Sequence, residues 1–239
     1  MCALSRDTVL RAMELLSAYQ KKGVDAVAAA EEQTDLYEDK LGSFLVRLSA
    51  KSLSDGDSRE VSRLLHCIGD FERIGDHAVN ICDVAGEIHD KSIVFSEDAR
   101  REIEVMVQAI TRILTLTAEA FIKDDPLLAS EVEPLEQVID DLRSEMKNRH
   151  IERLQRGRCT IEVGFVFNDF ITNCERVSDH CSNIAVCVVQ STSSDPALES
   201  HQYLNSIKVG QPLFTQKYEA YRSEYTLPAR TGAQQDRLE

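Results

Sequence analysis

Apolar residues recur along this chain at the three- and four-residue spacing that gives an α-helix one hydrophobic face. The alternation of apolar and polar residues that is typical of β-strands is scarce. Interruptions are also few, because the 239 residues include only 10 glycines and 5 prolines. The pattern therefore predicts an all-α fold.

Turn and capping signals divide this pattern into six long helices. The sequence "KKG" at Lys21–Gly23 is expected to end the first helix. Asp57 with Glu60 is expected to form a capping box for the third, and Asp125 to cap the fifth, with Pro126 as its first residue. The expected helices span about residues 5–21, 24–51, 58–89, 97–123, 126–157 and 160–190, with shorter ones near 197–207 and 213–225.

Two segments about a hundred residues apart are nearly the same. "FERIGDHAVNI" begins at Phe71 and "CERVSDHCSNI" begins at Cys174. A shift of 103 residues carries each apolar position of one segment onto an apolar or small position of the other, so each copy contributes one core-facing stripe. The stripes are Ile68, Phe71, Ile74, Ala78, Ile81 and Ala85, and Ile171, Cys174, Val177, Cys181, Ile184 and Val188.

This internal repeat predicts the domain organisation. We expect two pseudo-repeated antiparallel three-helix bundles, residues 1–90 and 91–195. A C-terminal tail, residues 196–239, is expected to be partly helical and then disordered.

Each half also carries two E-x-x-x-D sequences on neighbouring helices. Residues four apart lie one above the other on a helix, so each sequence forms a line of carboxylates, which we expect to face solvent or a partner rather than the core. Four carboxylates converging without counter-charge are unfavourable, and a bound multivalent cation relieves the repulsion. Oxygen ligands suit hard divalent or trivalent ions such as iron, manganese or magnesium better than zinc. The candidate metal ligands are Glu31, Asp35, Glu72 and Asp76, and Glu136, Asp140, Glu175 and Asp179.

Other polar residues of the repeated motif leave alternatives open. The histidines that follow each aspartate are expected to hydrogen-bond between helices or to support a metal ligand. The arginines that follow each glutamate are expected to pair with carboxylates of a neighbouring helix. An acidic residue and its amide counterpart lie at the edge of each carboxylate line and could add ligands. These residues are His77 and His180, Arg73 and Arg176, and Asp70 and Asn173.

Charge and composition narrow the possible partners. The chain has 41 acidic and 27 basic residues, a net charge of −14, which disfavours binding to nucleic acid or anionic lipid. The seven cysteines show no CxxC pair, and Cys67, Cys174 and Cys181 are expected to be small buried residues in a reducing compartment. No apolar run of about 18 residues is evident, so we expect a cytoplasmic chain without membrane insertion.

The repeated motif resembles "LERIGDHAxNI", the signature of PhoU domains, and the resemblance extends over about residues 4–190. It implies two three-helix bundles with one multinuclear metal cluster each, held by the eight carboxylates named above, with zinc also among the possible ions. It further implies a non-catalytic regulator of phosphate transport and phosphate signalling that acts through protein contacts. The C-terminal "HQYLNSIKVGQPLFTQKYEAYRSEYTLP" is similar to the tail of PhoU domains that follow Na⁺/phosphate cotransporters.

Three functions are therefore compared. The first is a metal-binding regulator at the inner face of the membrane, whose partner is a phosphate transporter, its membrane domain or a signalling protein, with a homodimer also possible. The second is a metal-free adaptor with acidic docking grooves. The third is a carboxylate-bridged di-iron enzyme, which needs Glu-x-x-His, whereas Glu72–His77 and Glu175–His180 are five apart. Since no glycine-rich phosphate loop or basic cluster is evident, we expect any phosphate to bind through metal.

Overall fold

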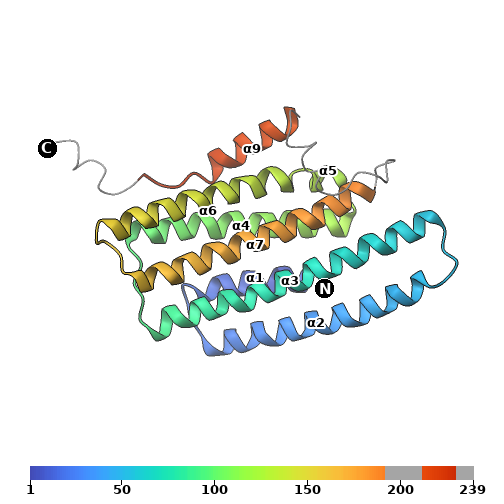
Figure 1. Ribbon diagram of the computed structural model, residues 1–239, viewed down its shortest axis with the longest axis horizontal. Helices are drawn as coiled ribbons and strands as arrows, with labels where there is room; N and C mark the ends of the chain where they lie inside the picture. The colour runs from blue at the N-terminus through green and yellow to red at the C-terminus, as the bar shows by residue number, and fades with distance from the viewer. Residues whose placement is uncertain (192–211, 230–239) are drawn as a thin grey trace.

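The computed structural model describes residues 1–191 and 212–229 of the chain, and these residues form helices and no strands (Figure 1). The all-α prediction is confirmed, as is the helix expected near residues 213–225. The helix expected at 197–207 and the disordered end expected after residue 230 lie outside the described residues. The helices are α1 (Cys2–Leu15), α2 (Lys21–Ser49), α3 (Asp55–Asp90), α4 (Glu97–Lys123), α5 (Pro126–Ala129), α6 (Val132–Gln155), α7 (Ile161–Ser191) and α9 (Pro212–Glu224).

Two three-helix bundles lie side by side, as the sequence predicted. Helices α1, α2 and α3 form one bundle, in the lower half of Figure 1, and α4, α6 and α7 form the other. The bundles meet along α3 and α7, and α9 packs on the outer side of α6. The division of the chain into domains at residues 90 and 195 stays a prediction.

The two apolar stripes of α3 and α7 lie in the core. All twelve stripe residues are buried, and nearly all belong to one hydrophobic cluster that continues from one bundle into the other. Only Ile68 lies elsewhere, in a small cluster with Leu45 and Val61 near the α2–α3 connection. Cys67, Cys174 and Cys181 are buried as expected, and all seven cysteines are free thiols.

The first helix ends earlier than the sequence predicted. It stops at Leu15, and "KKG" instead lies in the first turn of α2. Gly23 packs against the end of α1, where a Cβ on it would lie 2.6 Å from Cδ2 of Leu15. Gly23 therefore permits the end of α1 to pack closely against the start of α2, and it is not a helix C-cap.

Two other boundaries were also predicted wrongly. Ser54, three residues before Asp57, caps α3: its Oγ accepts from the Asp57 N–H at 3.2 Å and donates to Asp57 Oδ2 at 2.7 Å. Asp125 does cap a helix that begins with Pro126, but that helix is only four residues long. The long helix restarts at Val132 because Pro134 lacks an N–H and is tolerated only in a first turn.

Helix α4 is long and apolar enough to span a membrane, with 27 residues and a mean hydropathy of 1.4 over its most apolar window. Core helices of globular proteins meet the same criterion. In this fold Met106, Ile110 and Ile113 of α4 are fully buried among α1, α6 and α7. The expectation of no membrane insertion stays a prediction.

The two bundles differ on their outer faces. On α6, Asp141 accepts from the Tyr218 hydroxyl of α9 at 2.6 Å, and Arg149 donates to the Pro228 carbonyl at 2.8 Å. A shift of 105 residues, which superposes the E-x-x-x-D sequences, relates these two residues to Leu36 and Phe44 of α2. Those side chains are 50% and 55% exposed, so the first bundle presents an apolar face where the second is covered.

Candidate metal centre

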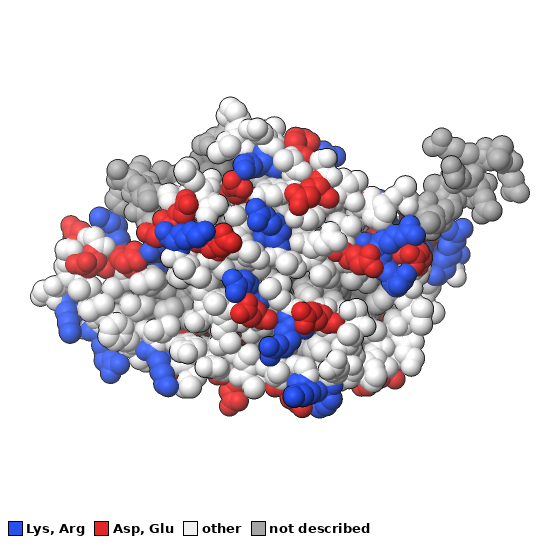
Figure 2. Space-filling view, turned by 180° about the vertical axis from the view of Figure 1, so that it is seen from behind, with Lys and Arg blue, Asp and Glu red and all other residues white. Residues whose placement is uncertain are grey.

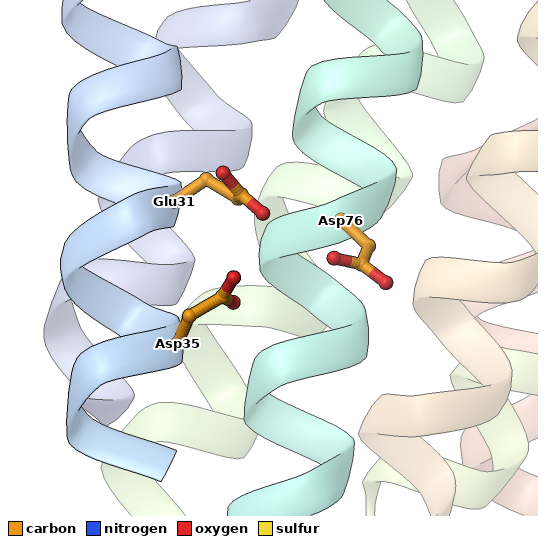
Figure 3. A group of neighbouring side chains, drawn as sticks. All are labelled: Glu31, Asp35 and Asp76. Atoms are coloured by element: carbon orange, nitrogen blue, oxygen red, sulfur yellow. The ribbon is translucent and has the colours of Figure 1, made fainter. Parts of the chain in front are cut away.

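The first candidate site lies in the groove between α2 and α3. Glu31 and Asp35 extend from α2 toward α3, from which Asp76 projects (Figure 3). One carboxylate oxygen from each residue lies within 4.8 Å of the others. Burial and the negative charges of Asp35 and Asp76 raise the pKa of Glu31, so this carboxyl is destabilised in its charged form. We call this group the first triad.

The second candidate site is the corresponding group between α6 and α7. Glu136 and Asp140 of α6 and Asp179 of α7 bring one oxygen each within 4.8 Å of one another. This second triad is more enclosed than the first, since Glu136 is only 7% exposed. Burial and the nearby Glu175 raise the pKa of Asp179. Both triads thus hold carboxylates close together at a cost that a cation would offset.

The two remaining predicted ligands, Glu72 and Glu175, do not belong to these triads. Glu72 is one turn before Asp76 on α3, and burial together with the charge of Asp76 raises its pKa to about 7. Glu175 lies 3.4 Å from Arg143 of α6. Their side chains are only 16% and 18% exposed, so these two carboxylates are largely covered at the edges of the grooves. The side chains of Asp76 and Asp179, one turn further along, are 32% and 37% exposed.

Arginines supply part of the counter-charge. Arg73 lies 3.4 Å from Glu72 and 3.3 Å from Asp76, and Arg176 lies 3.5 Å from Asp179. Both arginines therefore pair on their own helix, not with a neighbouring one as expected. Their side chains are largely exposed, so these ion pairs are screened by water. The arginine that pairs across the second groove is Arg143 of α6, which lies outside the repeated motif and was not predicted from the sequence.

The histidines of the motif join the two bundles. His77 Nδ1 lies 2.9 Å from Asn173 Oδ1, and His180 Nδ1 lies 2.8 Å from Asp70 Oδ1. The two imidazoles face each other across α3 and α7 with centroids 5.6 Å apart. The expectation that they hydrogen-bond between helices is confirmed. Their partners were missed, although the 103-residue shift that relates Asp70 to Asn173 also relates His77 to His180.

The comparisons with known proteins agree on one family. The PhoU domain model matches residues 1–85 and 103–188. The chain is 26% identical over 131 residues to the Thermotoga maritima phosphate-specific transport system accessory protein PhoU homolog 1, covering 55% of this chain and 56% of that protein. It is 23% identical over 152 residues to the PhoU homolog of Aquifex aeolicus, covering 62% and 66%. The matches thus span less than two thirds of these relatives' lengths.

Two solved structures share the fold. The crystal structure of PhoU from Pseudomonas aeruginosa has a TM-score of 0.75 at 20% identity and covers 80% of this chain and 91% of its own. That of the phosphate transport system regulatory protein PhoU from Streptococcus pneumoniae has a TM-score of 0.70 at 18% identity, covering 83% and 92%. With the family model matched in both bundles, the chain belongs to the PhoU domain family.

Proposed function

We propose that the chain is a non-catalytic, metal-binding regulator of phosphate transport that acts through contacts with other proteins. The observation that carries the metal proposal is the pair of triads, each with three carboxylate oxygens within 4.8 Å from two adjacent helices. Carboxylate oxygens are the donors that hard cations prefer, so iron, manganese and magnesium fit these donors better than zinc.

The energetics of the triads support a cation. Burial and nearby carboxylates raise the pKa of Glu31 and Asp179 in the triads and of Glu72 beside the first triad, so ionisation of these groups is unfavourable in the fold. A multivalent cation would reverse the sign of the local field and favour the ionised forms. Glu72 and Glu175 flank the triads one turn away, and we propose that they complete the two ligand sets by rotamer changes that release their arginines.

A metal-free adaptor is the second candidate. Arg143 neutralises part of the second groove through Glu175, and Arg73 does the same for the first through Glu72 and Asp76. Basic groups of a partner could supply the remaining charge. The di-iron enzyme has less support, because both triads consist of carboxylates alone and the motif histidines bond across α3 and α7.

The regulatory role rests on the relatives' names, which describe accessory and regulatory proteins of phosphate transport systems. A chain with this role would lie in the cytoplasm, at the inner face of the membrane beside a transporter or signalling protein. The exposed apolar side chains Leu36 and Phe44 on α2 support a protein contact on the first bundle. The tail sequence, which is similar to that of PhoU domains that follow Na⁺/phosphate cotransporters, supports a cotransporter membrane domain as the partner.

Elemental analysis tests the metal proposal. Protein purified without chelator, and again after EDTA treatment and reloading, is expected to hold several equivalents of metal per chain. The Asp76→Asn, Asp179→Asn double variant is expected to lose most of it. Asp83→Asn with Asp169→Asn is the matched control, since both residues are exposed, lie on the same two helices and change the charge equally. Unchanged metal content in the first variant would place the ligands elsewhere, and no metal under any loading would favour the adaptor.

A further inference from the structure

The second half of α2 presents large apolar side chains and two cations to solvent. Leu36 and Phe44 are 50% and 55% exposed, and Tyr37 and Leu41 are 39% and 38% exposed. Contiguous exposed apolar surface of this kind is typical of interaction sites. We call this surface the α2 face, and its residues are Leu36, Tyr37, Lys40, Leu41, Phe44 and Arg47.

Helix periodicity brings these side chains onto one side of α2. Tyr37, Lys40, Phe44 and Arg47 follow one another at intervals of three, four and three residues, which places them along one line of the helix. Aromatic and basic side chains therefore alternate along this line, with a leucine on either side of it. From residue 37 to residue 47 the line is about 15 Å long, at about 1.5 Å per residue. A surface of this length and shape fits a single helix of about three turns.

The corresponding surface of the second bundle is covered. The shift of 105 residues that superposes the E-x-x-x-D sequences relates Tyr37 and Leu41 to Leu142 and Met146 of α6, which are 6% and 0% exposed. Helix α6 packs against α4 and also against α9, which lies along its outer side in Figure 1. Among the described helices, α2 packs against α1 and α3. The second bundle thus shows that a helix can cover this surface of the repeat.

The charge of the α2 face is opposite to that of its counterpart on α6. The same shift relates its two cations to two carboxylates, Lys40 to Glu145 and Arg47 to Glu152. On α6, Glu131 accepts from Lys217 of α9 at 2.7 Å, so the helix that covers the acidic surface supplies a cation. A helix that covers the basic α2 face is expected to supply carboxylates instead.

The two cations of the α2 face form no ion pair with a carboxylate of the described residues. Arg47 Nε donates to the Ser43 carbonyl at 3.2 Å, whereas Lys21, at the start of the same helix, pairs with Asp25 at 3.2 Å. In Figure 2 the end of the first bundle formed by the α2–α3 connection lies at the lower left, where basic side chains stand on white surface with no acidic side chain between them. Both cations are therefore available to a partner.

Two other occupants fit this face less well. A two-fold dimer formed through it would place the cations of one copy near the same cations of the other, and like charges across a contact are costly. An anionic membrane attracts cations, but the net charge of −14 of the chain opposes its approach. Charge complementarity therefore favours an acidic helix of another protein.

We propose that the α2 face binds an amphipathic helix of a partner protein, one whose apolar side is flanked by glutamate or aspartate. The apolar side chains of this helix pack on Leu36, Tyr37 and Phe44, and its carboxylates pair with Lys40 and Arg47. The inference rests on the proposed function, because it specifies the partner of a regulator that acts through protein contacts. No ligand of the first triad belongs to the α2 face, so the contact is expected to form with and without metal.

The test uses a fluorescent reporter on the α2 face. The chain has no tryptophan, so Phe44→Trp introduces a single one there and keeps an aromatic side chain. The probe is a helical peptide of about 20 residues with leucines along one side and glutamates beside them, and a second peptide has lysines in place of the glutamates. The glutamate peptide is expected to bind saturably and to shift the emission to shorter wavelength. The lysine peptide is expected to bind at least about tenfold more weakly.

Charge reversal supplies the variant and its control. Lys40→Glu with Arg47→Glu, in the Phe44→Trp background, is expected to weaken binding of the glutamate peptide about tenfold and to strengthen binding of the lysine peptide. Lys21→Glu with Lys22→Glu is the matched control, since these exposed residues lie on the same helix and change the charge equally. They lie about 28 Å or more from Lys40, beyond the screening length at physiological salt, so affinity is expected to change less than about twofold.

Several outcomes would overturn the proposal. These are no saturable binding of the glutamate peptide, equal binding of the two peptides, or equal weakening by the reversal and the control. An emission shift with vesicles of phosphatidylglycerol and phosphatidylcholine, and none with the peptide, would assign the face to a membrane. A dimer in sedimentation that the Lys40, Arg47 reversal dissociates or tightens would assign it to a second copy.

Metal content measured on the same samples separates this inference from the metal proposal. The Lys40, Arg47 reversal is expected to keep the metal content of the parent. Failed peptide binding with normal metal content would reject the α2 face alone. Loss of metal in the Asp76, Asp179 variant is expected to leave peptide binding unchanged.

Discussion

At the scale of single residues, the fold changes the ionisation of Glu72. Its pKa is about 7, against an ordinary value of 4.5, because of burial and Asp76. Between these values the unfolded chain binds fewer protons than the folded one, so stability falls as pH rises. In chelator we therefore expect the melting temperature to decrease from pH 4.5 to pH 7, measured by circular dichroism.

Glu72→Gln isolates this contribution, because glutamine keeps the shape of the side chain without the charge. The variant is expected to lose part of the pH-dependent decrease and to melt higher than the parent at pH 7. Identical pH profiles for parent and variant would show that Glu72 ionises normally in the folded chain.

The candidate ligands also show which residue-level features a sequence can predict. Spacing of four on one helix is sufficient to bring Glu31 and Asp35 together, and the repeated motif identifies Asp76 as their neighbour on α3. The position of the Glu175 carboxylate was harder to predict from the sequence, because Arg143 on the adjacent helix binds it. Helix periodicity fixes the direction of a Cβ, whereas the rotamer beyond it depends on partners from distant parts of the chain.

At the scale of helices, the long amphipathic patterns and the bounds of α4 and α7 were predicted correctly, whereas the end of α1 and the starts of α3 and α6 were not. Twelve apolar positions on α3 and α7 are buried as the period requires. The errors at Gly23 and Pro134 both arise from context: Gly23 fits against Leu15 of another helix, and Pro134 is tolerated only in a first turn although it lies nine residues after the capping residue Asp125. Local signals mark where a helix can end, and packing decides among them.

Helix α2 provides a prediction because adjacent residues on it have opposite environments. Leu45 is buried with Val61 and Ile68, whereas Phe44 is 55% exposed. Leu45→Ala is expected to lower the free energy of unfolding by about 2–3 kcal/mol, and Phe44→Ser to change it by less than about 0.5 kcal/mol. Urea denaturation measures both. A large loss for Phe44→Ser would mean that this face is already covered, for example in a homodimer, which sedimentation of the variant would reveal.

At the scale of the whole molecule, the contact between α3 and α7 decides how the bundles stay together. Asp70 accepts from His180 and from Asn183, the latter at 3.1 Å, and Asn173 takes the matching position opposite His77. Asp70→Asn is therefore expected to leave the free energy of unfolding nearly unchanged, since the amide oxygen of Asn173 already accepts from His77. Asp70→Ala leaves His180 without its acceptor and is expected to cost about 1–3 kcal/mol in urea denaturation. Equal losses for both variants would show that the negative charge, and not the hydrogen bond, is what matters.

The two triads belong to different bundles, and this predicts how metal stabilises the molecule. A ligand that binds only the folded state adds about 2.7 kcal/mol per site at a hundredfold excess over its Kd. Asp76→Asn removes a ligand from the first triad and none from the second, so it is expected to keep about half of the metal and part of the metal-induced rise in melting temperature. Asp179→Asn is expected to give the complementary result. In both variants the remaining site is expected to keep its metal affinity, because the two sets of ligands share no residue. Complete loss of metal in either single variant would mean that the sites fill only together, with His77 and His180 at the α3–α7 contact as the connection between them.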